Sequence, residues 1–392
     1  MISKPLDKIE AADIQSLVTN GDEERRTMDF KRDLPGNADK DKNELRADVT
    51  SFANAGGGDL IFGVDEAGGV ATAVPGLPGV DPDAEIRRIE SVIQSSIDPR
   101  VPGFESRAIA IPGKGPVIVV RVPKSWRGPH LVKINDTFRM FGRNSKGKYI
   151  FDATEIRSAF ALSEQLPERI RRWRDDRLAR IIGGAGPVAL GPGALLVIHV
   201  VPLSSFAAGQ QVSVEAIQKS SQQFPPLCEG GGDTRVNIDG LLKFTGGRAG
   251  APGASSYCQV FRSGIVEGVS ARVVNTYEDR PRIPSTWLVQ KVVESVKQYR
   301  DGLLASDVAP PFTVLGTLSG AKGAILAVNQ RFVVWDHYPV DRDFVSLPEA
   351  LIESKDSDLL EDLRPLFDGV WNACGWVRCF DYNEQGKWAP PA

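Results

Sequence analysis

Apolar residues recur at every third or fourth position in three stretches of the first hundred residues, and this spacing predicts three amphipathic helices. The stretches are 9–18, 45–53 and 83–97. Asn20-Gly21 ends the first helix, Gly56-Gly57-Gly58 ends the second and Asp98-Pro99 ends the third. Because glycine accepts backbone conformations that other residues avoid, we interpret the three glycines as a tight passage from helix to strand rather than as a phosphate cradle.

Short runs of strand-forming residues follow these helices and predict a sheet. DLIFGV at 59–64 is followed by a turn and by VATAV at 70–74, so we expect a hairpin there. Three later runs, ESRAIAI, PVIVVRV and LVKINDTFRMFGR, are separated by proline and glycine. DATEIRSAFALS closes this part of the chain as a helix. The mixture predicts an α+β fold: an N-terminal mixed sheet with helices, followed by a second α+β domain.

A segment rich in glycine and proline divides the chain. Residues 166–182 predict an arginine-rich helix, and GGAGPVALGPG at 183–193 interrupts the pattern. A buried-strand pattern follows near 195, with a hairpin around Ser263-Gly264 and a helix from Ser285. A chain of 392 residues is longer than the ~250–300 residues at which single cores stop growing. We therefore predict a domain over 1–165, a helix and linker over 166–193, and a domain of unknown role over 194–392.

Composition places the chain among ordinary globular proteins, with 42% hydrophobic and 25% charged residues. No run approaches the ~18 apolar residues that a membrane span requires, and the first residues lack the apolar core of a signal peptide. We therefore expect a cytoplasmic protein with no membrane partner. Four scattered cysteines are too few for a disulfide framework in a chain of this size, so reduced thiols are expected.

Charge is nearly balanced overall, with 47 basic and 50 acidic residues, but it is uneven locally. The segment from Lys124 to Lys148, here called the basic strip, holds seven basic residues and one acid. Trp126, Phe138 and Phe141 lie among them, and aromatic rings between cations suit phosphates and unpaired bases. The alternative is a solvated charged face. The residues that we expect to bind nucleic acid are Lys133, Arg139, Arg143, Lys146 and Lys148.

Several motifs follow one another in the first part of the chain. ERRTMDFKRDL supplies a glutamate, then an acid, an aromatic residue and a lysine; the helix of ELRADVTSFANAGGG follows, and a strand leads to Gly-Val-Asp-Glu. In this order and over about 140 residues, the motifs resemble those of the Schlafen-AlbA family. The matching positions are Glu24, Asp29-Phe30-Lys31, Phe52-Ala53-Asn54, Gly57-Gly58 and Gly63-Val64-Asp65-Glu66. Phe138-Arg139 and Gly142-Arg143 match the later aromatic-arginine strand.

The resemblance implies a three-carboxylate catalytic site formed by Glu24, Asp29 and Glu66, with Asp65 as the alternate third acid. Only one of the two adjacent acids faces the site if the strand is regular. Carboxylates that hold Mg²⁺ or Mn²⁺ suit phosphodiester hydrolysis, because the cation stabilises phosphate charge and supplies hydroxide. Lys31, two residues from Asp29, is expected to share its face and to contact the scissile phosphate. The other interpretation is that the early acids are solvated charges.

The resemblance, together with these acids, implies a metal-dependent endoribonuclease that acts on structured RNA such as tRNA, and we expect RNA to be favoured over DNA. The resemblance implies a role in stress response or phage defence, and it implies a homodimer, because one copy of the domain must pair to form a two-lobed groove. No G-x-x-x-x-G-K-[ST] motif is present, so no ATP is expected. The alternatives are a non-catalytic DNA- or RNA-binding regulator with a C-terminal sensor or dimerisation domain, and an oligomerisation scaffold.

Overall fold

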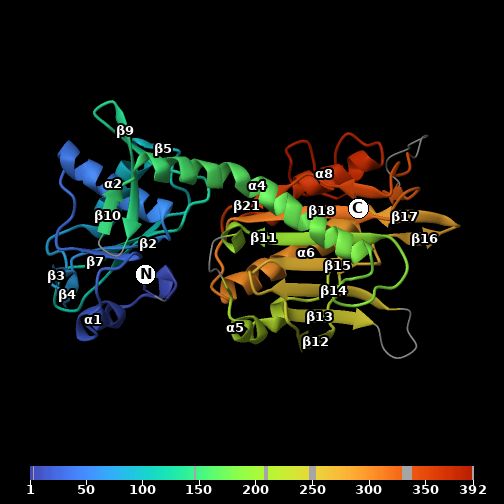
Figure 1. The fold of residues 1–392 in the computed structure, drawn as a ribbon, viewed down its shortest axis with the longest axis horizontal. Coiled ribbons are helices and arrows are strands. Elements are labelled where there is room, and N and C mark those ends of the chain that lie inside the picture. Colours follow the sequence, from blue (N-terminus) through green and yellow to red (C-terminus); the bar gives the residue numbers. More distant parts are fainter. Residues whose placement is uncertain (3, 145–146, 207–210, 247–252, 329–337, 391–392) are drawn as a thin grey trace. The chain divides into compact units, whose positions relative to one another are not determined.

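The computed structural model describes residues 1–390 apart from 3, 145–146, 207–210, 247–252 and 329–337. The chain forms two compact units, Met1–Gln165 and Leu166–Ala392 (Figure 1). Both combine helices with sheets, so the fold is α+β as predicted. No helix in the described part of the chain is both long and apolar enough to span a membrane.

A four-stranded sheet in the order β1-β2-β7-β6 forms the centre of the N-terminal unit. β1 and β2 are parallel, and the other two pairings are antiparallel. Helices α2 and α3 pack on one face of this sheet, where Val49, Phe52 and Ile89 join Leu60 and Val120 in a core. The elements so far are α1 (Ala11–Thr19), β1 (Met28–Lys31), α2 (Asp39–Asn54), β2 (Gly58–Phe62), α3 (Pro82–Gln94), β6 (Glu105–Ile109) and β7 (Val117–Val122), after the short helix η1 (Leu6–Lys8).

Two smaller groups of strands complete this unit. β3 (Asp65–Ala67) and β4 (Val70–Ala73) form a hairpin, whose first strand includes residues that we expected in the turn. The second sheet has the order β10-β9-β8-β5, and α2 packs against it. Its strands are β5 (Ile97–Asp98), β8 (Leu131–Ile134), β9 (Thr137–Asn144) and β10 (Gly147–Ile150). Thus α2 lies between the central sheet and the strands of the basic strip.

An antiparallel sheet in the order β12-β13-β14-β15-β11-β18-β20, with β21 also paired to β18, forms the second unit. Its members are β11 (Leu195–Pro202), β12 (Asp233–Val236), β13 (Gly240–Gly246), β14 (Ala254–Phe261), β15 (Val266–Ser270), β18 (Phe312–Ser319), β20 (Phe344–Ser346) and β21 (Ala350–Ile352). A small sheet contains β16 (Asn275–Tyr277), β17 (Arg280–Pro284) and β19 (Ile325–Ala327). The helices that follow β11 are η2 (Leu203–Phe206), α5 (Val214–Lys219), η3 (Ser221–Gln223), α6 (Ser285–Ala305), α7 (Leu359–Asp362) and α8 (Arg364–Ala373). The predicted hairpin at Ser263-Gly264 joins β14 to β15.

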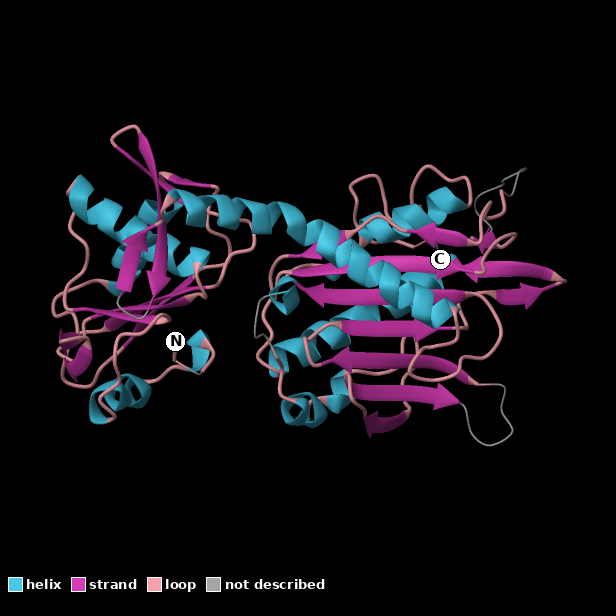
Figure 2. Ribbon diagram, viewed as in Figure 1, coloured by secondary structure: helices cyan, strands magenta, loops and turns pink. Residues whose placement is uncertain are grey.

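Alternation along β11 distributes its side chains between two cores, as a period of two requires. Ile198 and Val200 pack with the α6 side chains, whereas Val197 packs with Leu178 and Ile181 of α4 (Ala153–Ile182). Figure 2 shows the C-terminal part of α4 crossing one face of this sheet. The sequence pattern predicted two helices over 152–182, but the structure has one continuous helix that contains Pro167.

A buried charged group fixes α4 to the sheet of the second unit. Glu267 is fully buried and accepts two hydrogen bonds of 2.9 Å from Arg177, one of 2.8 Å from Tyr257 and one of 3.1 Å from His199. Burial alone raises the pKa of Glu267, but the hydrogen bonds from Arg177 and His199 lower it to about 2. The carboxylate therefore stays charged, and α4 is held by an ion pair as well as by apolar contacts.

The three consecutive glycines connect α2 to β2, as we interpreted them. Gly57 has φ +74°, and a Cβ there would lie 2.8 Å from the backbone nitrogen of Lys124. Gly56 has a negative φ and no atom within 4 Å of the position of a Cβ. Only Gly57 of this pair is therefore required by conformation and by space.

We expect Gly57→Ala to lower the free energy of unfolding by about 1–3 kcal/mol, because alanine is strained in the left-handed region and its methyl group meets the backbone of Lys124. Gly56→Ala is the matched control, and we expect it to leave stability unchanged or slightly higher. Thermal unfolding of the full chain measures both variants. Equal midpoints for the two variants would contradict this account.

Candidate functional site

Glu24 and Asp29, two of the predicted catalytic acids, lie together at β1. Asp29 is on the strand and is 4% exposed, whereas Glu24 precedes the strand and is half-buried. Glu24 Oε1 accepts the N–H of Phe30 at 2.9 Å, and the carboxyl group of Glu24 is near enough to that of Asp29 for the two to interact electrostatically. Burial and the neighbouring Asp29 raise the pKa of Glu24 to about 7. The structure thus brings these two acids into one site.

Two cations face the carboxylate of Asp29. Arg143 Nη2 lies 2.6 Å from Asp29 Oδ2, and Lys31 Nζ lies 3.0 Å from Asp29 Oδ1. Burial alone raises the pKa of Asp29, but the positive charges of Arg143 and Lys31 lower it below its usual value. Lys31 therefore shares the site with Asp29, as the alternation along a strand predicted.

Arg143 lies in the interior, although we expected it to bind nucleic acid. Its side chain is 2% exposed, and its guanidinium lies 4.3 Å from the centre of the Phe52 ring. A phosphate at the surface cannot reach a side chain so deeply covered. In this structure Arg143 is the partner of Asp29, and it joins β9 to β1.

Asp48 of α2 completes the group, and sequence reasoning missed it. Its side chain is 3% exposed, 2.7 Å from Lys148 Nζ, 3.9 Å from Arg143 Nη1 and 4.0 Å from Lys31 Nζ. Burial raises the pKa of Asp48, although Lys148 and Lys31 oppose the change. A signal was present, because Asp48 lies on the apolar stripe of α2, three residues after Leu45 and four before Phe52. A charge on such a stripe indicates a buried ion pair.

We call the six residues of this site the buried charge cluster: Glu24, Asp29, Lys31, Asp48, Arg143 and Lys148. It joins β1, α2, β9 and β10, with Glu24 just before β1. The exposed Glu44 adds an outer ion pair to Lys148. Lys148, which we also expected to bind nucleic acid, is therefore engaged by two acids.

The third predicted acid lies in the β3–β4 hairpin. Glu66 is exposed, and its Oε2 accepts the N–H of Gly69 at 2.6 Å. Asp65, the alternate, forms an ion pair of 2.6 Å with Arg32. The hairpin contacts Glu24 through the backbone, since the N–H of Glu24 donates to Gly69 O at 2.6 Å. Over the described residues, no three His, Cys, Asp or Glu side chains form a group that could hold a metal ion.

The pair formed by Glu24 and Asp29 still fits a divalent cation by its chemistry. Both are hard oxygen donors, and Mg²⁺ is often held by one or two carboxylates together with water and substrate phosphates. Oε1 of Glu24 and both oxygens of Asp29 have positive or N–H partners already. Asp29 therefore has two cationic partners, whereas the partner of Glu24 Oε1 is a backbone N–H.

The turn between β8 and β9 is an exposed part of the basic strip. Lys133 pairs with Phe138 across the two strands, and Arg139 pairs with Val132. Phe138 is 56% exposed and Arg139 is exposed, whereas Lys133 is exposed but lies 3.1 Å from Asp136. Figure 1 shows this hairpin projecting from the N-terminal unit. Lys146, the remaining predicted contact, lies outside the described residues.

The pKa of Glu24 predicts how its replacement alters stability with pH. Because the folded pKa of about 7 is above the unfolded value of 4.5, ionisation of Glu24 destabilises the fold as pH rises through this window. Glu24→Gln removes this penalty. We expect the variant and the wild type to unfold alike below about pH 4.5, and the variant to be more stable at pH 8. Urea unfolding in EDTA between these values measures the difference, with Glu23→Gln as the exposed control; a difference independent of pH would contradict the prediction.

Comparisons with known proteins agree with the sequence motifs. Residues 24–152 match the family model described as Schlafen, AlbA_2. One similar solved structure is an NMR structure of the N-terminal domain of a putative ATP-dependent DNA helicase RecG-related protein from Nitrosomonas europaea. It is 29% identical in sequence, with a TM-score of 0.24, and the match covers 30% of this chain and 74% of that chain. The DIP2311 protein from Corynebacterium diphtheriae is 17% identical, with a TM-score of 0.26, 54% of this chain covered and 33% of that one covered. No curated protein matches. The N-terminal unit of this chain therefore contains a domain of the Schlafen AlbA_2 family.

Proposed function

We propose that this protein is a metal-dependent endoribonuclease that cleaves structured RNA such as tRNA, with a role in stress response or phage defence. The observation that carries the proposal is the contact between Glu24 and Asp29 beside Lys31. Membership of the Schlafen AlbA_2 family supports a nucleic-acid-related function in general terms. A homodimer, which the family resemblance implied, stays a prediction.

Each residue of the site has a distinct part in the proposed reaction. Glu24 and Asp29 would hold Mg²⁺ or Mn²⁺, which supplies charge stabilisation and a metal-bound water of lowered pKa when bound. Lys31 is 35% exposed, so its ammonium is accessible to a phosphate while its charge also offsets that of Asp29. Arg143 and Asp48 do not touch the substrate in this proposal; they fix the orientation of Asp29 and Lys31.

A second candidate function is nucleic-acid binding without cleavage, as a regulator. Both oxygens of Asp29 already face cations, and Glu66 is hydrogen-bonded within its own turn. In this account the buried charge cluster is structural, and it holds the β9–β10 hairpin on β1 and α2. The exposed Lys133, Phe138 and Arg139 then provide the binding surface.

Cleavage assays separate the two candidates. Under the first, Glu24→Gln and Asp29→Asn reduce cleavage of total tRNA by more than ~100-fold, since loss of even an outer contact of a metal site costs 10–100-fold. Glu23→Gln, which removes an exposed neighbouring carboxylate, serves as the control. The wild type is assayed with Mg²⁺, with Mn²⁺ and with EDTA, and circular dichroism checks that each variant is folded.

Equal cleavage by the wild type and by folded Glu24→Gln would rule out this site as the catalytic centre. Binding of RNA by the wild type without cleavage in either metal would favour the regulator. Asp29→Asn is the less decisive variant because Asp29 is also the partner of Arg143. Glu24→Gln, which preserves size and removes charge, is therefore the primary test.

The β8–β9 hairpin yields a prediction that holds for both candidates. We expect Arg139→Glu to weaken binding to single-stranded RNA and to reduce the slope of log K against log salt concentration by about one, since a phosphate contact is lost. Phe138→Ala is expected to weaken binding without changing that slope, because stacking is not ionic. Lys40→Glu, a reversal of an exposed charge on α2, is the control. Anisotropy titrations at several salt concentrations measure these slopes, and an unchanged slope in Arg139→Glu would place the phosphate contacts elsewhere.

A further inference from the structure

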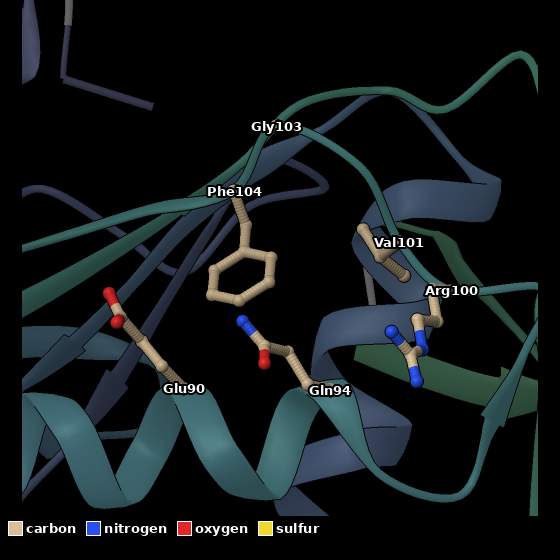
Figure 3. Close-up of a pocket in the computed structure, with 6 residues that line it drawn as sticks. All are labelled: Glu90, Gln94, Arg100, Val101, Gly103 and Phe104. Carbon is tan, nitrogen blue, oxygen red and sulfur yellow. The ribbon is translucent and has the colours of Figure 1, made fainter.

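A hollow of about 400 Å³ lies in the N-terminal unit between the end of α3 and the segment that leads into β6. It is lined by Glu90, Gln94, Arg100, Val101, Gly103 and Phe104 (Figure 3). None of these residues belongs to the buried charge cluster or to the β8–β9 hairpin. Its volume falls within the range of pockets that hold small ligands, about 300–1,000 Å³.

Packing fixes the apolar part of this hollow. Val101 is 6% exposed and belongs to the core that contains Val92 and Ile93 of α3. Phe104 is half-buried and packs against the same core, so only part of its ring is available. Gly103 has φ +65° and leaves its side of the hollow without a side chain. The ring of Phe104 is therefore a supported surface on which a flat group can stack.

Three polar side chains around the ring have unused hydrogen-bonding groups. Glu90 and Gln94 are one helical turn apart on α3, so they share a face. Figure 3 shows Glu90 and Arg100 towards opposite ends of the hollow, with Gln94 and Phe104 between them. Within the part of the chain that the structure describes, no hydrogen bond or ion pair engages the side chain of Glu90, Gln94 or Arg100.

We propose that this hollow binds an unpaired guanine base of a nucleic acid. Guanine presents two N–H donors on its Watson–Crick edge, which match the two acceptor oxygens of a carboxylate such as Glu90. Its O6 and N7 are acceptors that suit a guanidinium such as that of Arg100. Adenine has a lone pair where guanine has N1–H, so it places a lone pair against the carboxylate. Phe104 contributes stacking, and Gln94 can donate or accept at the base edge.

The base must be unpaired, because a paired guanine has its Watson–Crick edge occupied by cytosine. The proposal therefore rests on the proposed function in that the ligand belongs to a nucleic acid, and it adds a specificity that the charge cluster does not supply. A guanine held here would place one nucleotide of a loop or a single-stranded segment. The remainder of the strand is free to contact other parts of the domain.

Oligonucleotides that differ at one base test whether Glu90 recognises the Watson–Crick edge of guanine. The full-length protein is titrated with oligouridine that carries one central guanine, adenine or inosine, and binding is followed by anisotropy. We expect guanine to bind about tenfold more tightly than adenine, as one good bidentate contact provides. Inosine lacks the N2 amino group, so its affinity is expected to lie between the two. Equal affinities for guanine and adenine would overturn the proposal.

Substitutions of the lining residues test whether a preference for guanine arises from this hollow. Glu90→Gln keeps the size of the side chain but has one acceptor oxygen, so we expect the preference for guanine over adenine to disappear. Arg100→Ala is expected to remove the difference between guanine and 7-deazaguanine. Glu384→Gln removes an exposed carboxylate of the second unit and is the control. A preference for guanine that persists in folded Glu90→Gln would overturn the assignment to this hollow.

The outcome is independent of cleavage, so it separates this proposal from the proposed function. RNA cleavage by the wild type with no preference for guanine would overturn the hollow as a base site and leave the nuclease standing. A guanine preference that Glu90→Gln abolishes, in a protein that does not cleave RNA, would support the hollow and reject the nuclease. No binding of any oligonucleotide would overturn the hollow as a base site, whereas cleavage of total tRNA would still decide the proposed function.

Discussion

The ion pair between Asp29 and Arg143 is the interaction on which the N-terminal unit depends most. The two residues are 114 positions apart in sequence, yet Arg143 Nη2 lies 2.6 Å from Asp29 Oδ2 and both side chains are nearly excluded from solvent. Removal of one partner of such a buried pair leaves an unpaired charge in the interior, which typically costs about 3–5 kcal/mol. The pair therefore fixes the last strands of the domain to the first.

This constraint also limits what the site can do. Asp29 is needed as the counter-ion of Arg143, so its charge is not wholly available to a substrate or cation. Glu24 differs because it is half-buried, and only its Oε1 has a backbone partner. Within the buried charge cluster, Asp29 and Asp48 are therefore the acids that serve mainly as partners in buried ion pairs. The chemical freedom lies with Glu24 and Lys31, which are the members nearer to solvent.

Local patterns predicted the main helices of the N-terminal unit and several of its strands, because periods of 3.6 and 2 depend on neighbouring residues alone. The helical stripe at Leu45 and the buried-strand pattern near 195 are examples, whereas many strands of the second unit were not predicted. Pairing across long separations was less accessible: the basic strip suggested a surface role for Arg143, whereas its partner Asp29 draws it into the interior. The contact of Glu24 with Asp29 was expected from family motifs. Asp48 was missed because its partners come from β1, β9 and β10.

Phe52 explains why a glycine begins β2. A Cβ at Gly58 would lie 2.2 Å from Phe52 Cε1, and the guanidinium of Arg143 lies 4.3 Å from the centre of the same ring. Asn54, two residues later, donates to the carbonyl oxygens of His130 and Phe141 at 2.9 Å. Residues 52–58, which carry the pattern F-A-N-x-x-G-G, thus make the contacts that hold α2 against the sheet and the β8–β9 hairpin. The presence of this pattern in a chain is evidence of the domain's architecture, and catalytic competence must be judged separately, from the acids that lie outside it.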